Sequence, residues 1–349
     1  MENNSNQNMA GGVQRTDISI LRIIASLAVV MIHTCNTITN NLETFNPTSY
    51  QYKILVTINS LFNWSVPMFF MITGVLLLRR DKVIEYKDCI CKYAKRILLS
   101  LFIFGVPFAW LEIFAETKVV SLDYVLDGVA RVISGNSWGH LWYLYELIGV
   151  YLVLPIIKAF TDRATQKEMR TALTILFLFN LFIQTLNGIN PVIGFYLPIR
   201  TSAIFYLMLG RYLDEEIPYT IYKYKHILLV AAMIALIVIS LVAPNNASVV
   251  LGYSSPVTAL LTVAIFCSLR GCRFRNIEIL WKTDRLCFSV YLCHPVFTNL
   301  VYKLFRVTPL MFGNLIIFGI VSFWAIFVIC GFISAKMLNL IPVLRKNVL

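Results

Sequence analysis

The sequence is poor in charged residues. Lysine, arginine, aspartate and glutamate make up 14% of its 349 residues, whereas 58% are hydrophobic. A soluble domain carries about 25% charged residues, so this composition excludes an ordinary soluble protein. Acidic residues are fewer than basic ones, 18 against 30, which gives a net charge of +12. The preference of cytoplasmic membrane loops for lysine and arginine explains that excess, and we expect no nucleic-acid partner.

The eight cysteines also lack the spacing of a disulfide framework or a zinc site. Cys89 and Cys91 form one Cys-x-Cys pair without a second pair, so we expect no metal. The polar first fourteen residues lack the cationic start and cleavage site of a signal peptide. We therefore predict a disordered cytoplasmic tail over 1–14, one transmembrane domain over 15–340 and a second cytoplasmic tail over 341–349.

Long apolar stretches dominate the remainder of the chain. About 20 apolar residues cross a bilayer, and ten stretches approach that length, which predicts an all-α, polytopic membrane bundle of about ten transmembrane helices. The spans lie near 17–36, 54–78, 97–115, 138–157, 171–188, 200–213, 226–244, 255–270, 286–305 and 309–335. Four spans contain a proline that should kink or break the helix, namely Pro67, Pro107, Pro155 and Pro295.

Basic residues predict the orientation of these spans. Alternating the loops between the two sides of the membrane places 23 lysines and arginines on one side and six on the other, with Arg22 inside the first span. Cytoplasmic loops are enriched in lysine and arginine. The split therefore predicts that both termini face the cytoplasm and that the protein lies in the cell membrane. Arg22 would then lie near the cytoplasmic face and His33 near the outer face.

The first span carries a polar seam. Arg22 and His33 are eleven residues apart, about three turns plus 20°, so both side chains lie on one helix face, roughly 16 Å apart along the axis. Other polar residues extend the seam: Arg15, Ser26, Asn36 and Asn40. Ionisable residues within the bilayer usually face a bundle interior and mark a site or a pathway. The seam is therefore expected to form one wall of an internal conduit.

The fourth span opens with the sequence WGHLWYLYELIG, which contains His140, Trp142, Tyr143 and Glu146. A histidine and a carboxylate meeting across helices would provide a general base with its orienting acid. The alternative for Glu146 is a neutral or paired group that serves helix packing. The alternative for the aromatic residues is a belt at the membrane surface.

Two further spans and one loop carry polar candidates. His294 precedes Pro295 in the ninth span. We expect it either to face a polar interior shared with His33 and His140 or to be a packing residue that is hydrogen-bonded to a backbone carbonyl. Arg200 begins the sixth span, where it anchors a substrate or snorkels to the surface. Lys92, Lys95 and Arg96 lie before the third span and suit either the phosphates of an anionic donor or lipid headgroups.

Several motifs together resemble one family. RTDISILRIIASLAVVMIH is similar to the opening of the membrane-bound acyltransferase-3 family, whose hallmark is an arginine, ten residues and a histidine, as in Arg22 and His33. Other landmarks follow in family order: SVPMFFMITGVLLL, KYAKRILL, GHLWYLYELIGVYLVLP, FYLMLGRYL and YLCHP. The likeness covers essentially the whole chain from about residue 15.

The resemblance implies an integral membrane enzyme that transfers an acyl group, usually acetyl, from cytoplasmic acyl-CoA. The acceptor would be a hydroxyl of a cell-envelope carbohydrate or a related molecule. His33 would be catalytic, and Arg22 would bind or orient the donor. Members often carry two arginines three residues apart where this chain has Lys92, Lys95 and then Arg96, and lysine lacks the bidentate fork of arginine.

The residues and the resemblance lead to one working picture. The donor enters against a positive rim formed with Lys92, Lys95 and Arg96, and His33 with Glu146 activates the acceptor hydroxyl. The remaining candidates for substrate binding are His140, Trp142, Tyr143, Arg200, Tyr291 and His294. One alternative is a transporter or exporter of a small polar solute or polysaccharide, although no inverted repeat is visible. A sensor or scaffold without catalysis is a third possibility.

Overall fold

The structure, a computed structural model, describes residues 15–41, 49–270 and 277–349. Every regular element in these ranges is a helix, and seven helical segments are long and apolar enough to cross a membrane. This confirms the all-α polytopic bundle. The seven segments are Thr16–Thr39, Tyr50–Leu77, Tyr86–Phe114, Gly139–Arg163, Gln166–Ile189, Tyr219–Val242 and Pro309–Asn339. A shorter apolar helix covers Pro256–Leu269, and the total of ten crossings stays a prediction.

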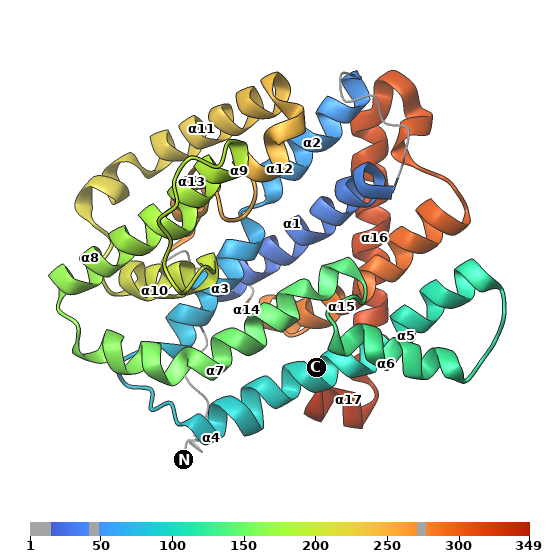
Figure 1. Cartoon of the computed structure of the whole chain (residues 1–349), viewed down its shortest axis with the longest axis horizontal. Helices are drawn as coiled ribbons and strands as arrows, with labels where there is room; N and C mark the ends of the chain where they lie inside the picture. The colour runs from blue at the N-terminus through green and yellow to red at the C-terminus, as the bar shows by residue number, and fades with distance from the viewer. Residues whose placement is uncertain (1–14, 42–48, 271–276) are drawn as a thin grey trace, which may run out of the picture.

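Helix α1 (Thr16–Asn41) runs through the middle of the bundle (Figure 1). Its neighbours include α2 (Tyr50–Phe62), α3 (Ser65–Leu77), α14 (Ile277–Asp284), α15 (Cys287–Asn299) and α16 (Ile316–Asn339). Leu21, Ala25 and Val30 have no exposed surface. Because apolar side chains cover most of α1, neighbours can surround it, and its polar seam is left to face an internal space.

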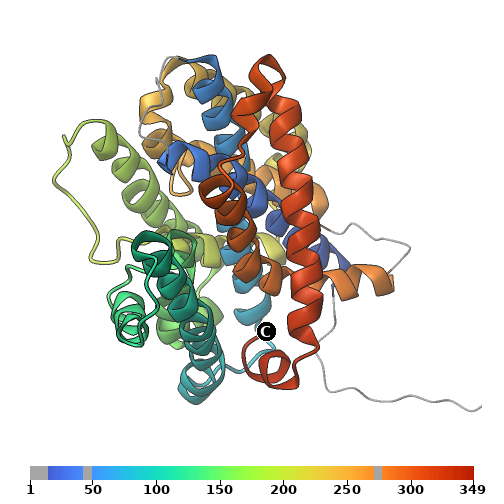
Figure 2. The same cartoon turned by 90° about the vertical axis from the view of Figure 1, so that its right-hand side faces the viewer.

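The remaining helices complete the bundle. They are α4 (Tyr86–Asp88), α5 (Lys95–Thr117), α6 (Asp123–Ile133), α7 (Trp142–Arg163), α8 (Gln166–Phe177), α9 (Ile183–Ile189), α10 (Ser202–Glu215), α11 (Tyr219–Val242), α12 (Ala247–Val250), α13 (Pro256–Leu269) and α17 (Pro342–Asn347). Figure 2 shows α17, beside the C-terminus, folded against the lower end of α16. The predicted second tail, 341–349, thus contains a short helix.

The second span is broken where a proline predicts it. Helix α2 ends at Phe62, and α3 starts at Ser65, so that Pro67 lies in the first helical turn, where its missing N–H leaves no intrahelical bond unmade. The Asn63 side chain donates to the Leu251 carbonyl at 2.8 Å. This contact ties the break to the segment that leads into α13.

Two glycines set the distance between α3 and α10. A Cβ on Gly74 would lie 1.9 Å from the Leu207 carbonyl oxygen, and one on Gly210 would lie 2.2 Å from the Met71 carbonyl oxygen. The obstructing atoms belong to the backbone, so a side-chain rotation cannot make room. Small residues that let two backbones approach are a common packing device of membrane helices.

We predict that Gly74→Ala and Gly210→Ala each destabilise the bundle. Overpacking a tight contact costs about 1–3 kcal/mol, and more when only backbone can move. Thermal unfolding in detergent should show a lower midpoint for both variants. Gly149→Ala on α7 is the control, because nothing lies within 4 Å of its Cβ position. Equal midpoints for the three variants would contradict the close α3–α10 contact.

Candidate active site

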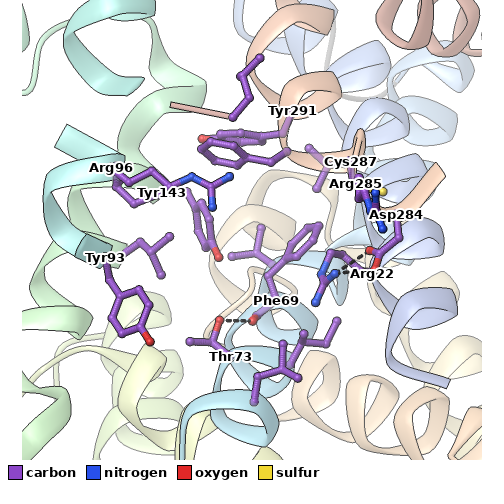
Figure 3. A pocket seen from close by; sticks show the side chains of 18 of the residues that line it. Arg22, Phe69, Thr73, Tyr93, Arg96, Tyr143, Asp284, Arg285, Cys287 and Tyr291 are labelled. Atoms are coloured by element: carbon purple, nitrogen blue, oxygen red, sulfur yellow. Dashed lines mark hydrogen bonds and ion pairs between the residues drawn. The ribbon is translucent and has the colours of Figure 1, made fainter. Parts of the chain in front are cut away.

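A cavity of about 740 Å³ lies beside α1. Its walls come from α1, α3, α5, α7 and α15, and one end is closed by residues of α17. His33 and His140 line it, as do Arg96, Arg285 and Arg345. In Figure 3, Arg96 and Arg22 reach into it from opposite sides. Two residues of the predicted seam, Arg22 and His33, therefore face this cavity, whereas Arg15 pairs with Asp17 and Asp214.

Three of the four histidines of the chain meet beside this cavity. The ring centre of His33 lies 6.1 Å from that of His140 and 5.1 Å from that of His294, and the last two are 6.3 Å apart. They come from α1, the turn before α7, and α15. His33 and His140 line the cavity, whereas His294 lies behind them, and the substrate-binding role of His140 and His294 stays a prediction. Within the described residues, no group of three or more His, Cys, Asp or Glu residues is placed to hold a metal ion.

The three rings differ in how they are held. The Nδ1 atom of His294 lies 2.8 Å from the Val290 carbonyl, and the Tyr291 hydroxyl donates to the His140 backbone carbonyl at 2.5 Å. The Nε2 atoms of His140 and His294 are buried without a hydrogen-bond partner. His33 makes no hydrogen bond to any residue in the described ranges, and its ring borders the cavity. An unpaired buried polar atom is costly, so the cluster is suited to a ligand that supplies polar groups.

Glu146 does not join the histidines, and that part of the prediction is wrong. Tyr143, Leu147 and Tyr151, four residues apart, form the stripe of α7 that lines the cavity. Glu146 precedes Leu147 by one residue, about 100° around the helix. It borders a second, apolar hollow of about 670 Å³ between α7, α8 and α10, and accepts a hydrogen bond from the Thr201 hydroxyl. Its packing role, the alternative considered above, agrees with this position.

Arg22 lines the cavity with its charge already paired. Its Nη1 atom lies 2.6 and 2.7 Å from the two carboxylate oxygens of Asp284 (Figure 3). The Ser19 hydroxyl donates to the same carboxylate at 2.8 Å. The Asp284 side chain is 5% exposed. Sequence reasoning missed Asp284, 262 residues away, although an acidic residue at the start of the ninth span was a possible signal.

We predict that Asp284→Ala strongly destabilises the protein. Removing one partner of a buried ion pair leaves an uncompensated charge and costs about 3–5 kcal/mol. The unfolding midpoint in detergent should fall sharply. The control is Glu278→Ala on the same helix, because Glu278 pairs with Lys282 at an exposed position and should leave the midpoint unchanged. Similar midpoints for both variants would show that the Arg22–Asp284 pair does not hold α1 in place.

The basic end of the cavity differs from the predicted rim. Tyr93, Arg96 and Ile97 line it, whereas Lys92 and Lys95 do not. Each lysine precedes a lining residue by one position and therefore points to another helix face. Lys92 instead lies over the Tyr93 ring, 5.6 Å from its centre. Both lysines lie outside the cavity lining, and their role in binding the donor phosphates stays a prediction.

Two arginines that sequence reasoning missed take their place. Arg285, between α14 and α15, and Arg345, on α17, line the same cavity as Arg96. The loop that precedes α4 adds a further cation nearby. Lys82 also lies over the Tyr93 ring at 5.6 Å, and its burial, together with the neighbouring charges of Lys92 and Arg79, lowers its pKa.

Some of the other predicted substrate-binding residues line the cavity, and one does not. Trp142, Tyr143 and Tyr291 line the cavity, and the rings of Tyr143 and Tyr291 are 5.8 Å apart. Arg200 lies outside it, exposed, with its guanidinium 4.0 Å above the Tyr196 ring. The structure thus brings together most of the predicted substrate-binding residues, and it leaves Arg200 at the surface.

The fold and the site define a polytopic helical membrane protein with a histidine-lined internal cavity. The family model described as an acyltransferase domain matches residues 15–334. The chain belongs to this acyltransferase-3 family and is an acyltransferase. Comparisons with curated proteins and with solved structures give no match.

Proposed function

We propose that this acyltransferase moves an acyl group, acetyl in the simplest case, from cytoplasmic acyl-CoA to a hydroxyl of a cell-envelope carbohydrate or related acceptor. The observation that supports this most is the single cavity that joins His33 to a cluster of arginines. Arginine suits the phosphates of the donor, and a free imidazole suits proton transfer. The excess of basic loops on one side supports an orientation with both termini and the arginine end at the cytoplasmic face of the cell membrane.

In this reaction His33 acts as the general base. It takes the proton of the acceptor hydroxyl, the oxygen attacks the thioester carbonyl, and the carbon–sulfur bond breaks as the tetrahedral intermediate collapses. The imidazolium of His33 returns the proton to the departing thiolate, which leaves as the free thiol. His140 also lines the cavity, and its Nε2 atom, which lacks a partner, is positioned as a further group for the developing oxyanion.

The length of the cavity fits a donor that is anchored far from its reacting end. Arg22 and His33 both line the cavity, and eleven helical residues separate them by about 16 Å along α1. A pantetheine arm spans a comparable distance. The phosphates would then remain among the arginines while the thioester reaches His33.

We predict that His33→Ala abolishes acetyl-CoA-dependent acyl transfer or acetyl-CoA hydrolysis by the purified protein in nanodiscs. Loss of a general base lowers turnover by roughly 10²–10⁴-fold. The control is His226→Ala, because His226 is an exposed histidine on α11. Both variants should unfold at the wild-type temperature. Full turnover by His33→Ala would refute the role of His33.

The same purified protein distinguishes acyl transfer from the alternative, solute transport. A transporter would show no turnover or binding of acyl-CoA in the wild type, and reconstituted vesicles would accumulate a polar solute. Acetyl transfer by the wild type that disappears in His33→Ala would exclude transport as the principal activity.

A further inference from the structure

We infer that α17 belongs to the donor site. Arg345 on this helix, together with Arg285 and Arg96, forms a phosphate clamp, defined here as these three guanidinium groups. The inference rests on the proposed function, because the phosphates in question are those of the donor. It assigns recognition to Arg285 and Arg345, which are distant in sequence from the first-span motif and from the basic segment before α5.

The charge balance at this end of the cavity supports the clamp. Within the described residues, the Arg285 and Arg345 side chains have no carboxylate partner, and Arg96 donates only to a backbone carbonyl. Arg22, which lines the same cavity, is already neutralised by Asp284. Like charges that line one cavity repel each other unless an anion joins them. A ligand with several phosphate groups balances three guanidinium groups and can accept paired hydrogen bonds from each.

The way α17 is attached supports the clamp independently. Val348, just after α17, is 1% exposed, and its carbonyl accepts hydrogen bonds from Arg96 Nε at 3.2 Å and Ser100 Oγ at 3.1 Å. Leu349 and Arg345 both line the cavity. The segment is therefore packed against α5 as a wall of the site, and the same contact fixes the position of Arg96.

Aromatic packing further defines the direction of Arg96. Its guanidinium lies 5.7 Å from the centre of the Phe288 ring, and Phe288 also lines the cavity. A guanidinium held against an aromatic face keeps its edge N–H groups available for an anion. The clamp would recognise the phosphates and leave the acyl end unconstrained, so it should affect donor affinity rather than the chemical step.

The test compares neighbouring basic residues in the full chain. The protein is placed in nanodiscs of phosphatidylcholine alone, so that no anionic lipid competes, and binding of coenzyme A and of dephospho-coenzyme A is measured by calorimetry. Arg345→Gln and Arg285→Gln should weaken coenzyme A binding at least tenfold. The matched controls are Lys346→Gln and Lys282→Gln, which remove the same charge at positions that do not line the cavity and should stay within twofold.

A second variant tests the attachment of α17 without removing a charge. Ser100→Ala deletes the hydroxyl that donates to Val348. It should weaken coenzyme A binding several-fold and leave binding of acetyl-pantetheine, which lacks the nucleotide and its diphosphate, at the wild-type level. Unfolding midpoints identify any variant that has simply lost its fold, and Arg345→Lys should restore part of the affinity lost in Arg345→Gln.

The possible results separate the two proposals. If the wild type binds coenzyme A and Arg345→Gln binds it as tightly as Lys346→Gln, the clamp is refuted and the proposed function stands. If the wild type does not bind coenzyme A, the proposed function fails, and inorganic pyrophosphate becomes the probe. Pyrophosphate binding that depends on Arg345 would support the clamp for another phosphorylated ligand, and its absence would refute the clamp. Restored binding only with anionic lipid would assign the arginines to headgroups and also refute it.

Discussion

The structure depends on the pairing of charge inside an apolar bundle. Arg22 on the central helix is matched by Asp284, and Ser19 donates to the same carboxylate. Unpaired, either charge would be expensive at this depth. The pair therefore fixes the rotation of α1 relative to α14 and α15. That rotation turns His33, eleven residues along the same face, toward His140 and His294.

The cavity combines two chemical environments along one wall of α1. Imidazole and aromatic rings, including those of Tyr143 and Tyr291, line it together with the guanidinium groups of Arg96, Arg285 and Arg345. The proposed acyl donor combines the same two kinds of group, a neutral thioester and charged phosphates. The second hollow, at Glu146, is apolar and separate from this arrangement. The geometry thus supports a transfer reaction at the histidines, with the donor held from the arginine end.

Local periodicity predicted part of the site, whereas some candidates chosen for their residue type lie outside the cavity lining. The spacing of Arg22 and His33 places both on one face of α1, and the structure agrees. Glu146 and the pair Lys92 and Lys95 were chosen for their residue type, and each lies one position away from a lining residue. One position turns a side chain by about 100°, which is enough to move it to another surface. Asp284, Arg285 and Arg345 were not predicted because no local pattern relates them to α1.

The class of protein, the helical segments and the polar seam of the first span can be predicted from the amino-acid sequence alone. These follow from hydropathy, from the 3.6-residue period and from the motifs shared with the acyltransferase-3 family, all of which are local. Which helix faces meet in the bundle is set by the tertiary packing. Helix order in a bundle depends on contacts between distant residues, such as Gly74 with Leu207 and Arg96 with Val348. Such contacts leave no periodic trace in the chain, because their partners lie more than a hundred residues apart.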